Sequence, residues 1–365
     1  MAIPRETALG IFSTTMLKSY TELIPSPNFL TSFYTVKTSS AKQIGVEIER
    51  GNEMIAVQSL RGTNGNLNTS SLWSGKYFLP PFYNEFGNAT ALDRYDRTPF
   101  VGTDFTPETI GLFGTDVAKM QLKNRAKIER AKELMAADVF QTGVISIKNG
   151  DNIDYGRKAT SMVDLGAAGY WGNTDAAIEA QLIAGAEFIR REGKNGTPEF
   201  NLVLSGAAYT ALKGSDYFAK YANFQNVQLI DVKQPQAKAF SAAYHGRITA
   251  GAYLFNIWSY DEIYQDSDEV YHRYLDQDTA FMTPVSGTRF ELSHAGVPAI
   301  MRDKSKAEFG KFIAQVAGEY WMYDRVDEAN FAHEFGVMSA PLAIPVTVDM
   351  IYTMTVLGTG NPAIG

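Results

Sequence analysis

The sequence predicts an α+β fold in two packed units, with an N-terminal arm and a long hairpin loop that extend from them. At 365 residues, the chain exceeds the size at which a single core stops growing, and 45% of its residues are hydrophobic. Residues 41–85 show the alternation of paired strands, and residues 115–141 have the periodicity of one long helix. From Trp171 onward, helical and strand patterns alternate.

The composition excludes several classes of protein. The chain has no cysteine, which removes disulfides, thiolate metal sites and cysteine nucleophiles. Its formal net charge is −7, so any contact with nucleic acid must come from a local basic strip. The sequence contains no run of about 18 apolar residues, the length needed to span a membrane. The N-terminus lacks the regions of a secretory signal, so we expect a protein made and kept in the cytoplasm, or in a particle assembled there.

The first part of the chain predicts two extensions. The apolar patch in residues 27–36 is too short to form a core alone, so this arm must pack on its own body or on a neighbour. Residues 41–60 predict strands, and an edge-type strand returns at Pro80-Pro81 after a tip rich in Gly, Asn and Ser. A two-stranded projection is not stable alone in water, so we expect it to lie on another subunit. Its tip region contains Arg61, Trp73 and Lys76.

A long helix is predicted from about Thr115 to Gln141. Thr106-Pro107 is a favourable helix start upstream of it, and Thr142-Gly143 is a stop signal. The apolar stripe is narrow, which favours a strut over a core helix. Basic residues at helical spacing form a ridge that is either a solvated face or a contact with a polyanion or an acidic neighbour. They are Lys119, Lys123, Lys127 and Arg130.

Shorter elements are predicted in the rest of the chain. Residues 143–157 indicate a hairpin with an Asn-Gly turn, and residues 251–265 with 270–275 indicate a further hairpin. Thr174 is a candidate cap for a helix with one buried face, and residues 201–205 predict a buried strand. Residues 337–357 predict a closing strand pair.

Catalytic and metal-binding motifs are absent from the sequence. There is no nucleophile elbow, phosphate loop or dinucleotide fingerprint, and the four histidines lack the spacing of a zinc helix. Asp266 and Asp268 begin like a calcium loop, but Tyr271 stands where glycine is needed and Gln277 where the bidentate glutamate is needed. A solvated turn is therefore favoured there. We predict no catalytic residue, no cofactor and no metal site.

The order of these segments resembles the lambda-type major capsid (head) proteins of tailed bacteriophages, which share the Hong Kong 97 capsid fold. Residues 27–36 resemble the proline-then-aromatic N-arm of that family, residues 41–85 its extended loop (the E-loop), and residues 113–143 its spine helix. Residues 170–189 resemble the start of its axial domain, and residues 337–356 its closing Ser-Ala-Pro strand.

The resemblance implies a division of the chain into five segments. They are an N-terminal arm (1–40), the E-loop (41–85), a peripheral domain with the spine helix (86–170), a mixed α/β axial domain (171–325), and the closing strands of the peripheral domain with the C-terminus (326–365).

The resemblance also implies a structural major capsid protein, not an enzyme, that self-assembles as pentamers and hexamers into an icosahedral head enclosing double-stranded DNA. In that fold the spine helix and N-arm face the interior, and the E-loop overlies an adjacent subunit. The implied partners are further copies of the chain, packaged DNA held by non-specific contact, and separate scaffolding, portal and decoration proteins. The implied location is the virion, assembled in the host cytoplasm without a membrane. Candidate inter-subunit or interior contacts are Arg61, Trp73, Lys76, Lys119, Lys123, Lys127 and Arg130.

Three other classes stay open. An encapsulin-like nanocompartment shell of the same fold would enclose enzyme cargo instead of a genome. An enzyme with an unfamiliar site on residues 171–320 could draw a carboxylate pair from Asp261, Glu262, Asp266 or Asp268. A tail or adhesion protein that binds glycans through surface aromatic residues is permitted by the 19 tyrosines, although these are dispersed.

Overall fold

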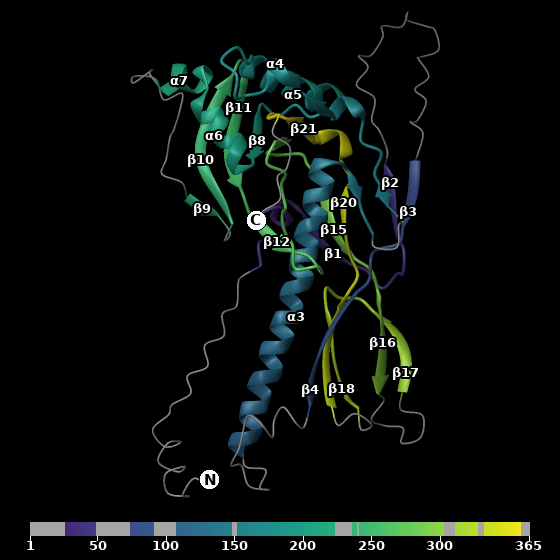
Figure 1. Ribbon diagram of the computed structural model, residues 1–365. Coiled ribbons are helices and arrows are strands. Elements are labelled where there is room, and N and C mark those ends of the chain that lie inside the picture. The colour runs from purple at the N-terminus through teal and green to yellow at the C-terminus, as the bar shows by residue number, and fades with distance from the viewer. Residues whose placement is uncertain are drawn as a thin grey trace, which may run out of the picture.

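The computed structural model describes residues 26–48, 74–90, 107–147, 152–222, 236–238, 241–302, 311–327 and 332–358. The molecule is elongated, with an α/β body at one end and a long helix that runs from this body to the other end beside a sheet (Figure 1). Helices occur together with parallel and antiparallel strand pairs, so the predicted α+β class is confirmed. Within these residues, no helix is long and apolar enough to cross a membrane.

The body is built on a seven-stranded sheet with the strand order β7-β21-β14-β8-β11-β10-β9. Its strands are β7 (Met162–Asp164), β8 (Glu199–Leu204), β9 (Gln236–Lys238), β10 (Ala242–Ala250), β11 (Tyr253–Tyr260), β14 (Thr279–Pro284) and β21 (Tyr352–Thr355). Strand β8 lies at the centre, parallel to β11 and antiparallel to β14. The buried strand predicted at 201–205 is therefore confirmed, with a start at Glu199.

Helices cover one face of this sheet (Figure 1). The helices of the body are α4 (Gly166–Gly169), α5 (Ile178–Glu192), α6 (Gly206–Gly214) and α7 (Asp216–Ala222). Alternate residues of β8, Phe200 and Leu202, share a core with Leu182 and Ala186 of α5. The face of α5 that the sequence predicts to be buried is thus the buried one.

The N-termini of α5 and α6 are fixed in different ways. Thr174 is not the cap of α5: residues 173–176 form a turn, and Ala177 occupies the N-cap position without a side-chain bond. At α6, Ser205 is the N-cap, and its Oγ accepts the N–H of Ala208 at 3.0 Å. The strand-to-helix step at Ser205 is therefore fixed locally, whereas the start of α5 is set by packing.

The long helix α3 (Pro107–Gln141) begins earlier than predicted and ends where predicted. The structure starts it at Pro107 rather than at about Thr115, because proline is tolerated in the first helical turn and the helix then continues without a break. After Gln141, Gly143 adopts the left-handed conformation (φ +73°) of a helix stop.

The prediction of a strut with a thin seam is wrong for the C-terminal third of α3. Met135, Ala136, Val139 and Phe140 are each 3% exposed or less. Phe140 stacks on Phe281 of β14, with ring centroids 4.7 Å apart. The N-terminal arm and the sheet both pack on this part of the helix, so its buried surface is wider than one apolar stripe. The sequence of the helix alone does not show that two elements cover it.

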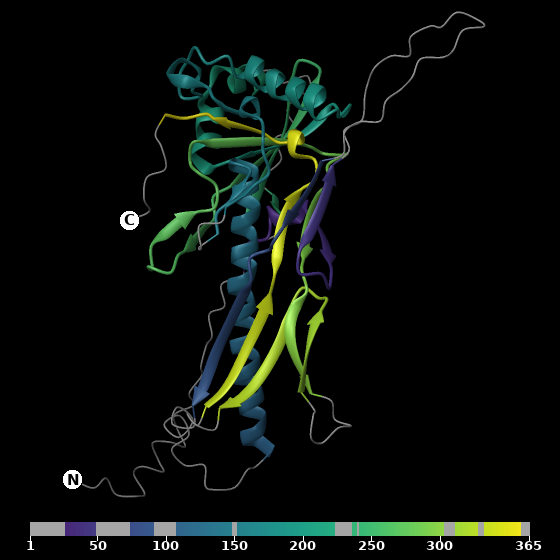
Figure 2. The ribbon, with the colours of Figure 1, turned by 90° about the vertical axis from the view of Figure 1, so that its right-hand side faces the viewer.

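A three-stranded antiparallel sheet, β18-β19-β4, lies beside the N-terminal half of α3 (Figure 2). Its strands are β4 (Tyr83–Thr90), β18 (Trp321–Asp327) and β19 (Ala332–Ser339), and the hairpin of β16 (Val297–Arg302) and β17 (Lys311–Val316) lies next to them. The Asn124 amide donates to the Phe335 carbonyl at 3.5 Å, and Met120 lies against Gly87. Helix and sheet are therefore in direct contact.

The arm and the closing residues meet in a third sheet, β1-β15-β20. Its strands are β1 (Thr35–Thr38), β15 (Phe290–His294) and β20 (Pro341–Pro345), and β1 is parallel to β15. The closing strand pair predicted at 337–357 is corrected. Strand β20 pairs with β15, whereas β21 pairs with β14 and β7. The short helix η3 (Val348–Met350) after Pro345 turns the chain from one sheet to the other.

Three hairpins complete the described structure. They are β2 (Ile44–Ile48) with β3 (Ser74–Phe78), β5 (Val144–Ile145) with β6 (Ile153–Asp154), and β12 (Ile263–Gln265) with β13 (Tyr271–Arg273). The hairpin predicted at 143–157 is confirmed, although its Asn-Gly turn lies outside the described residues. The hairpin predicted from 251–265 is corrected: only β12 pairs with β13, and β11 belongs to the seven-stranded sheet. The E-loop is described at its root, β2 and β3, and not between residues 49 and 73.

The five-segment division of the chain stays a prediction, and the observed sheets cross its boundaries. Strands β7 and β21 lie outside residues 171–325 but belong to the seven-stranded sheet. Strand β16 lies inside that range, yet Val297 at its start packs with Trp321 and Met338 of the three-stranded sheet.

The carboxyl group of Asp138, in the last turns of α3, predicts a pH dependence of stability. Burial, and then the charge of Asp276, raise its pKa from 3.8 to about 7. Between these values the folded protein binds a proton that the unfolded chain has released, so stability falls as pH rises toward and through 7. We expect Asp138→Asn to exceed wild type in free energy of unfolding by roughly 1–2 kcal/mol at pH 8, and to match it near pH 4.

Urea unfolding of both proteins at a series of pH values measures this difference. The exposed Asp175→Asn variant is the matched control and is expected to follow wild type throughout. A constant difference between Asp138→Asn and wild type across the pH range would contradict the assignment.

Candidate functional site

The described residues hold no cluster of metal-binding side chains. Among them, no group of three or more His, Asp or Glu side chains could hold a metal ion. His245 bonds to the hydroxyl of Ser259 at 2.7 Å, and His272 bonds to Asp266 at 2.8 Å. His294 is fully buried, and burial lowers its pKa to about 4, so it is neutral at physiological pH.

The acidic residues that resemble a calcium loop form the turn between β12 and β13. Asp266 Oδ1 accepts the N–H groups of Asp268 (2.8 Å) and Val270 (2.9 Å). These bonds and the contact with His272 lower the pKa of Asp266. Asp261, at the base of the hairpin, forms an ion pair with Arg273. The predicted solvated turn is confirmed, and its carboxylates organise the hairpin.

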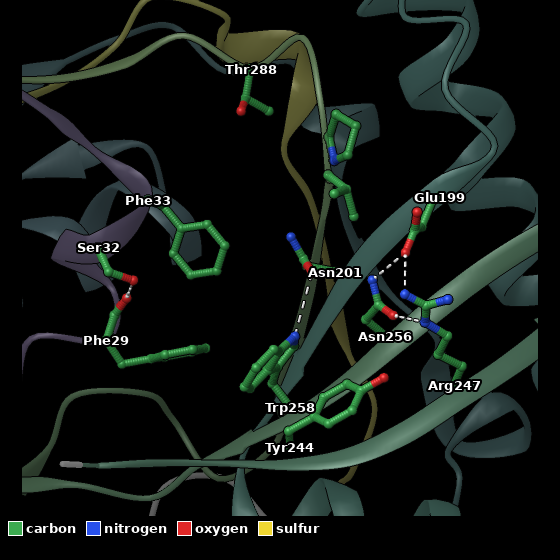
Figure 3. Close-up of a pocket in the computed structure, with 12 residues that line it drawn as sticks. Phe29, Ser32, Phe33, Glu199, Asn201, Tyr244, Arg247, Asn256, Trp258 and Thr288 are labelled. Atoms are coloured by element: carbon green, nitrogen blue, oxygen red, sulfur yellow. Dashed lines mark hydrogen bonds and ion pairs between the residues drawn. The ribbon is translucent and has the colours of Figure 1, made fainter. Parts of the chain in front are cut away.

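A cavity of about 690 Å³ lies between the arm and the face of the seven-stranded sheet opposite α5 and α6 (Figure 3). Aromatic rings from both sides line it: Phe29 and Phe33 from the arm, and Tyr244 and Trp258 from β10 and β11. The Phe29 and Trp258 rings are 5.6 Å apart, and the Tyr244 and Trp258 rings 4.7 Å apart. The cavity is thus the space that the docked arm leaves over the sheet.

The polar side chains of this cavity bond to each other. Glu199 Oε1 accepts from Asn256 at 2.9 Å and from Arg247 at 3.2 Å, while Arg247 Nε donates to Asn256 Oδ1 at 2.8 Å. Among the lining residues, no nucleophile lies beside a base, so the arrangement fixes the sheet surface and offers no chemical step. The sequence pattern misses this group because its members come from three strands that only the fold brings together.

The arm is fastened to its own body through Glu133 of α3. Glu133 Oε1 accepts the N–H of Leu30 at 2.7 Å, and Oε2 accepts the N–H of Thr31 at 2.9 Å. The hydroxyl of Tyr260 donates to Oε1 at 3.0 Å. Burial raises the pKa of Glu133, and the two backbone donors and the tyrosine oppose that rise. A fully buried carboxylate therefore satisfies two backbone groups of the arm.

Aromatic packing continues the attachment of the arm. Phe29 and Leu30 are almost completely buried, and the Phe29 ring stacks on Tyr260 with centroids 5.6 Å apart. Tyr34 lies edge-on to Phe140 of α3. The sequence left open whether the arm packs on its own body or on a neighbour. In the structure, residues 26–38 pack on the body of their own chain.

Exposed apolar side chains gather where the E-loop returns to the body. We call Tyr77, Leu79, Phe82 and Phe86 the apolar strip; their exposed fractions are 77%, 54%, 50% and 55%. They lie on β3, on the connection after it and on β4. The connection contains Pro80, which is buried, and Pro81. Several large apolar side chains exposed along one stretch of chain are candidates for a protein contact.

The hairpin of β12 and β13 carries a second exposed apolar group. Ile263, Val270 and Tyr271 are between 41% and 45% exposed. The exposed acidic residues Asp268 and Glu269 lie at its tip. The sequence predicted that the projection of residues 41–85 lies on another subunit, but it did not single out the residues of either set, because alternation in a strand does not reveal which face lacks a partner.

The basic ridge of α3 divides into two parts. Lys127 forms an ion pair with Glu85 of β4, with Nζ 3.2 Å from Oε2. Lys119, Lys123 and Arg130 point away from the three-stranded sheet, because at 3.6 residues per turn they lie on the side of α3 opposite Ile128. Of the other candidate contacts, Lys76 lies on β3 opposite Val46, whereas Arg61 and Trp73 lie outside the described residues.

The chain is similar in structure to several capsid and shell proteins. A proposed capsid protein of a prophage in E. coli CFT073 matches with a TM-score of 0.58 and 14% sequence identity, over 98% of this chain and 100% of that chain. The SrpI encapsulin of Synechococcus elongatus PCC 7942 matches with a TM-score of 0.47 and 10% identity, over 98% and 96%. The capsid protein of cyanophage P-SCSP1u matches with a TM-score of 0.45 and 11% identity, over 95% and 93%. Only the first similarity supports an argument, and it concerns the fold alone.

The architecture is that of the capsid proteins with the Hong Kong 97 fold, as the resemblance implied. None of the curated proteins matches the sequence. The family model described as phage major capsid protein E matches residues 13–356. The chain therefore belongs to the phage major capsid protein E family, and it is a structural protein of the phage virion. The recognition made from the order of the sequence segments is confirmed.

Proposed function

We propose that this capsid protein assembles with copies of itself into pentamers and hexamers that close into an icosahedral head around double-stranded DNA. The observation that carries the proposal is the apolar strip on a chain of this family. Four large side chains, each at least half exposed, are unfavourable in water unless another molecule covers them. In a closed shell, further copies of the same chain supply that cover.

The proposed role is structural and does not include catalysis. The family is one of structural proteins, and the described carboxylates and histidines discussed above take part in turns, ion pairs and packing. Scaffolding, portal and decoration proteins stay predicted partners. Assembly in the host cytoplasm also stays a prediction.

Electron microscopy and sedimentation of the purified full-length protein test the proposal. We expect closed shells with five-fold and six-fold capsomers, formed alone or with a co-expressed scaffolding protein. A chain that stays monomeric at high concentration under both conditions would overturn it. Particles purified from lysed host cells are expected to contain nuclease-resistant double-stranded DNA; particles filled with protein cargo instead would favour a nanocompartment.

The part of the basic ridge that lies on the side of α3 away from the sheet is proposed to face the packaged DNA. Lys119, Lys123 and Arg130 form a row on the side of α3 away from the sheet, where they would partly screen the nearest layer of phosphates. The net charge of −7 leaves the subunit as a whole unattractive to DNA, so the shell would confine DNA without adsorbing it tightly.

Substituting these three residues with glutamine tests this role. We expect DNA-filled heads of the triple variant to release DNA at a lower temperature than wild type, with a greater difference at low salt, because screening by the protein is lost. Lys127→Gln is the matched control, since its ammonium group is already paired with Glu85. Equal release temperatures for the triple variant and wild type at every salt concentration would count against an interior position of the ridge.

A further inference from the structure

We propose that the tip of the β12–β13 hairpin docks on the apolar strip of a second copy of this chain, a contact that repeats from subunit to subunit within a capsomer. The proposal rests on the proposed function, since it needs an assembled shell. It assigns a partner to two surfaces that the fold leaves exposed. Its test separates failure of this contact from failure of assembly.

The hairpin extends away from the packed body. Among the described strands, β12 and β13 pair with each other and with no further strand. An isolated two-stranded hairpin is marginal in water, so packing at its base and its own turn must hold it. At the base, the ring of Tyr264 packs on Tyr274 with centroids 4.9 Å apart. Ile263, Val270 and Tyr271 keep their exposed apolar surface.

The tip is rigid before any partner binds. Asp266 accepts the N–H groups of Asp268 and Val270 through one oxygen and contacts His272 through the other. Its own N–H donates to the Val270 carbonyl at 3.0 Å, and Gln265 donates to the Glu269 carbonyl at 3.1 Å. A turn ordered in advance loses little conformational entropy on binding, so its exposed groups can contribute fully to a contact.

The apolar strip is equally well shaped to receive it. The ring of Tyr77 on β3 lies against Gly45 of β2, where a Cβ would be 3.0 Å from it, so the glycine leaves room for the ring. Pro80 and Pro81 stiffen the chain between Leu79 and Phe82. Both the hairpin and the apolar strip therefore offer apolar side chains to the contact.

The charges around the two surfaces are complementary. Asp268 and Glu269 are exposed at the hairpin tip. Lys42, two residues before β2 at the root of the E-loop, is exposed. Charges at the rim of an apolar contact favour the correct orientation of the partner.

The positions of the two surfaces require a second copy as the partner. Figure 2 shows the β12–β13 hairpin on one side of α3 and the β2–β3 hairpin, at the root of the E-loop, on the other side. The hairpin and the part of the apolar strip at the root of the E-loop therefore lie on opposite sides of α3 in the same chain. Two different patches on opposite sides of one subunit give a heterologous contact, which forms a ring when the rotation between subunits closes.

Cysteine cross-linking tests the contact, because the chain has no cysteine of its own. Val270→Cys and Leu79→Cys are made as separate full-length variants, mixed before assembly, and treated in the shell with a short bis-maleimide. We expect a covalent dimer in the mixture and none from either variant alone, since the contact joins different patches. Val270→Cys mixed with Glu187→Cys, exposed on α5, is the matched control and should give only background.

The possible outcomes are distinct. Shells that form while the Val270→Cys and Leu79→Cys mixture gives no more dimer than the control would overturn this inference and leave the proposed function standing. Failure of wild-type protein to form shells would instead contradict the proposed function.

If the cysteine variants do not assemble, exchanging the charges at the rims of the two surfaces is a second test of the contact. Asp268→Lys and Lys42→Glu are each expected to slow shell formation, whereas an Asp268→Lys, Lys42→Glu double variant is expected to recover it, because opposite charges then face each other again. Additive losses in the double variant would overturn the inference.

Discussion

Replacing Arg157 with alanine is expected to lower the free energy of unfolding by about 3–5 kcal/mol. Its guanidinium is buried at the C-terminal end of α3, where three carbonyls lack helical partners. Nη1 donates to the carbonyls of Phe140 (2.9 Å) and Gln141 (3.2 Å), and lies 3.4 Å from that of Val139. Burial lowers the pKa of Arg157 to about 10, so it still carries its charge at neutral pH.

The same side chain joins the helix to the closing strand. Nη2 donates to the Ser161 carbonyl at 3.2 Å, to the Ile351 carbonyl at 3.3 Å and to Thr353 Oγ1 at 2.9 Å. A positive charge at a helix C-terminus also interacts favourably with the helix dipole. Removal therefore leaves carbonyls of α3, of the 3-10 helix η2 (Ala159–Ser161) and of the residue before β21 without the arginine donor. The Phe140 carbonyl keeps the Thr353 hydroxyl as a donor at 2.7 Å.

Urea unfolding followed by circular dichroism measures the loss. Arg191→Ala is the control, since that side chain is 74% exposed and its removal is expected to change stability by less than about 0.5 kcal/mol. Arg157→Lys keeps the charge but loses the forked donor geometry, so an intermediate loss is expected. If Arg157→Ala unfolds within error of Arg191→Ala, the bonds at the helix end do not contribute as argued.

Replacing Glu133 with alanine is expected to release the N-terminal arm from the body. The backbone N–H groups of Leu30 and Thr31 and the hydroxyl of Tyr260 would lose their acceptor, and each buried unsatisfied donor is unfavourable by roughly 1–3 kcal/mol. Glu133→Gln keeps one acceptor oxygen but sets an amide N–H against a backbone N–H. We therefore expect a smaller release for Gln than for Ala.

Amide hydrogen exchange at Leu30 and Thr31 measures arm docking directly. We expect exchange at least about tenfold faster in Glu133→Ala than in wild type, which corresponds to a loss of about 1.4 kcal/mol of local stability. Exchange in α5, for example at Leu182, is the internal control and should not change. Protection of Leu30 and Thr31 that survives in both variants would show that aromatic packing alone holds the arm.

The fold class and several elements could be predicted from the sequence. The buried face of α5, the strand at β8 and the stop at Gly143 depend on local periodicity and on glycine's freedom to adopt positive φ, and these signals lie within one segment. The family could also be predicted, because the order of segments along the chain is itself a property of the sequence.

The contact surfaces could be predicted only in part. The basic ridge follows from spacing on one helix, but only the structure shows that Lys127 is paired with Glu85 while Lys119 and Lys123 are directed away from the sheet. The apolar strip was not predicted, since alternating residues in β4 do not indicate which face a neighbouring element covers. Exposure depends on neighbours that are distant in sequence.

The sequence by itself determined the α+β class, the long helix and its end, and membership of the capsid family, because each depends on local pattern or linear order. The tertiary structure decided where the arm lies, which sheets take β20 and β21, and the role of Glu133 as the acceptor for the arm. These features arise from pairing between segments far apart in the chain. Their free energy comes from burial and hydrogen bonds that no single segment contains.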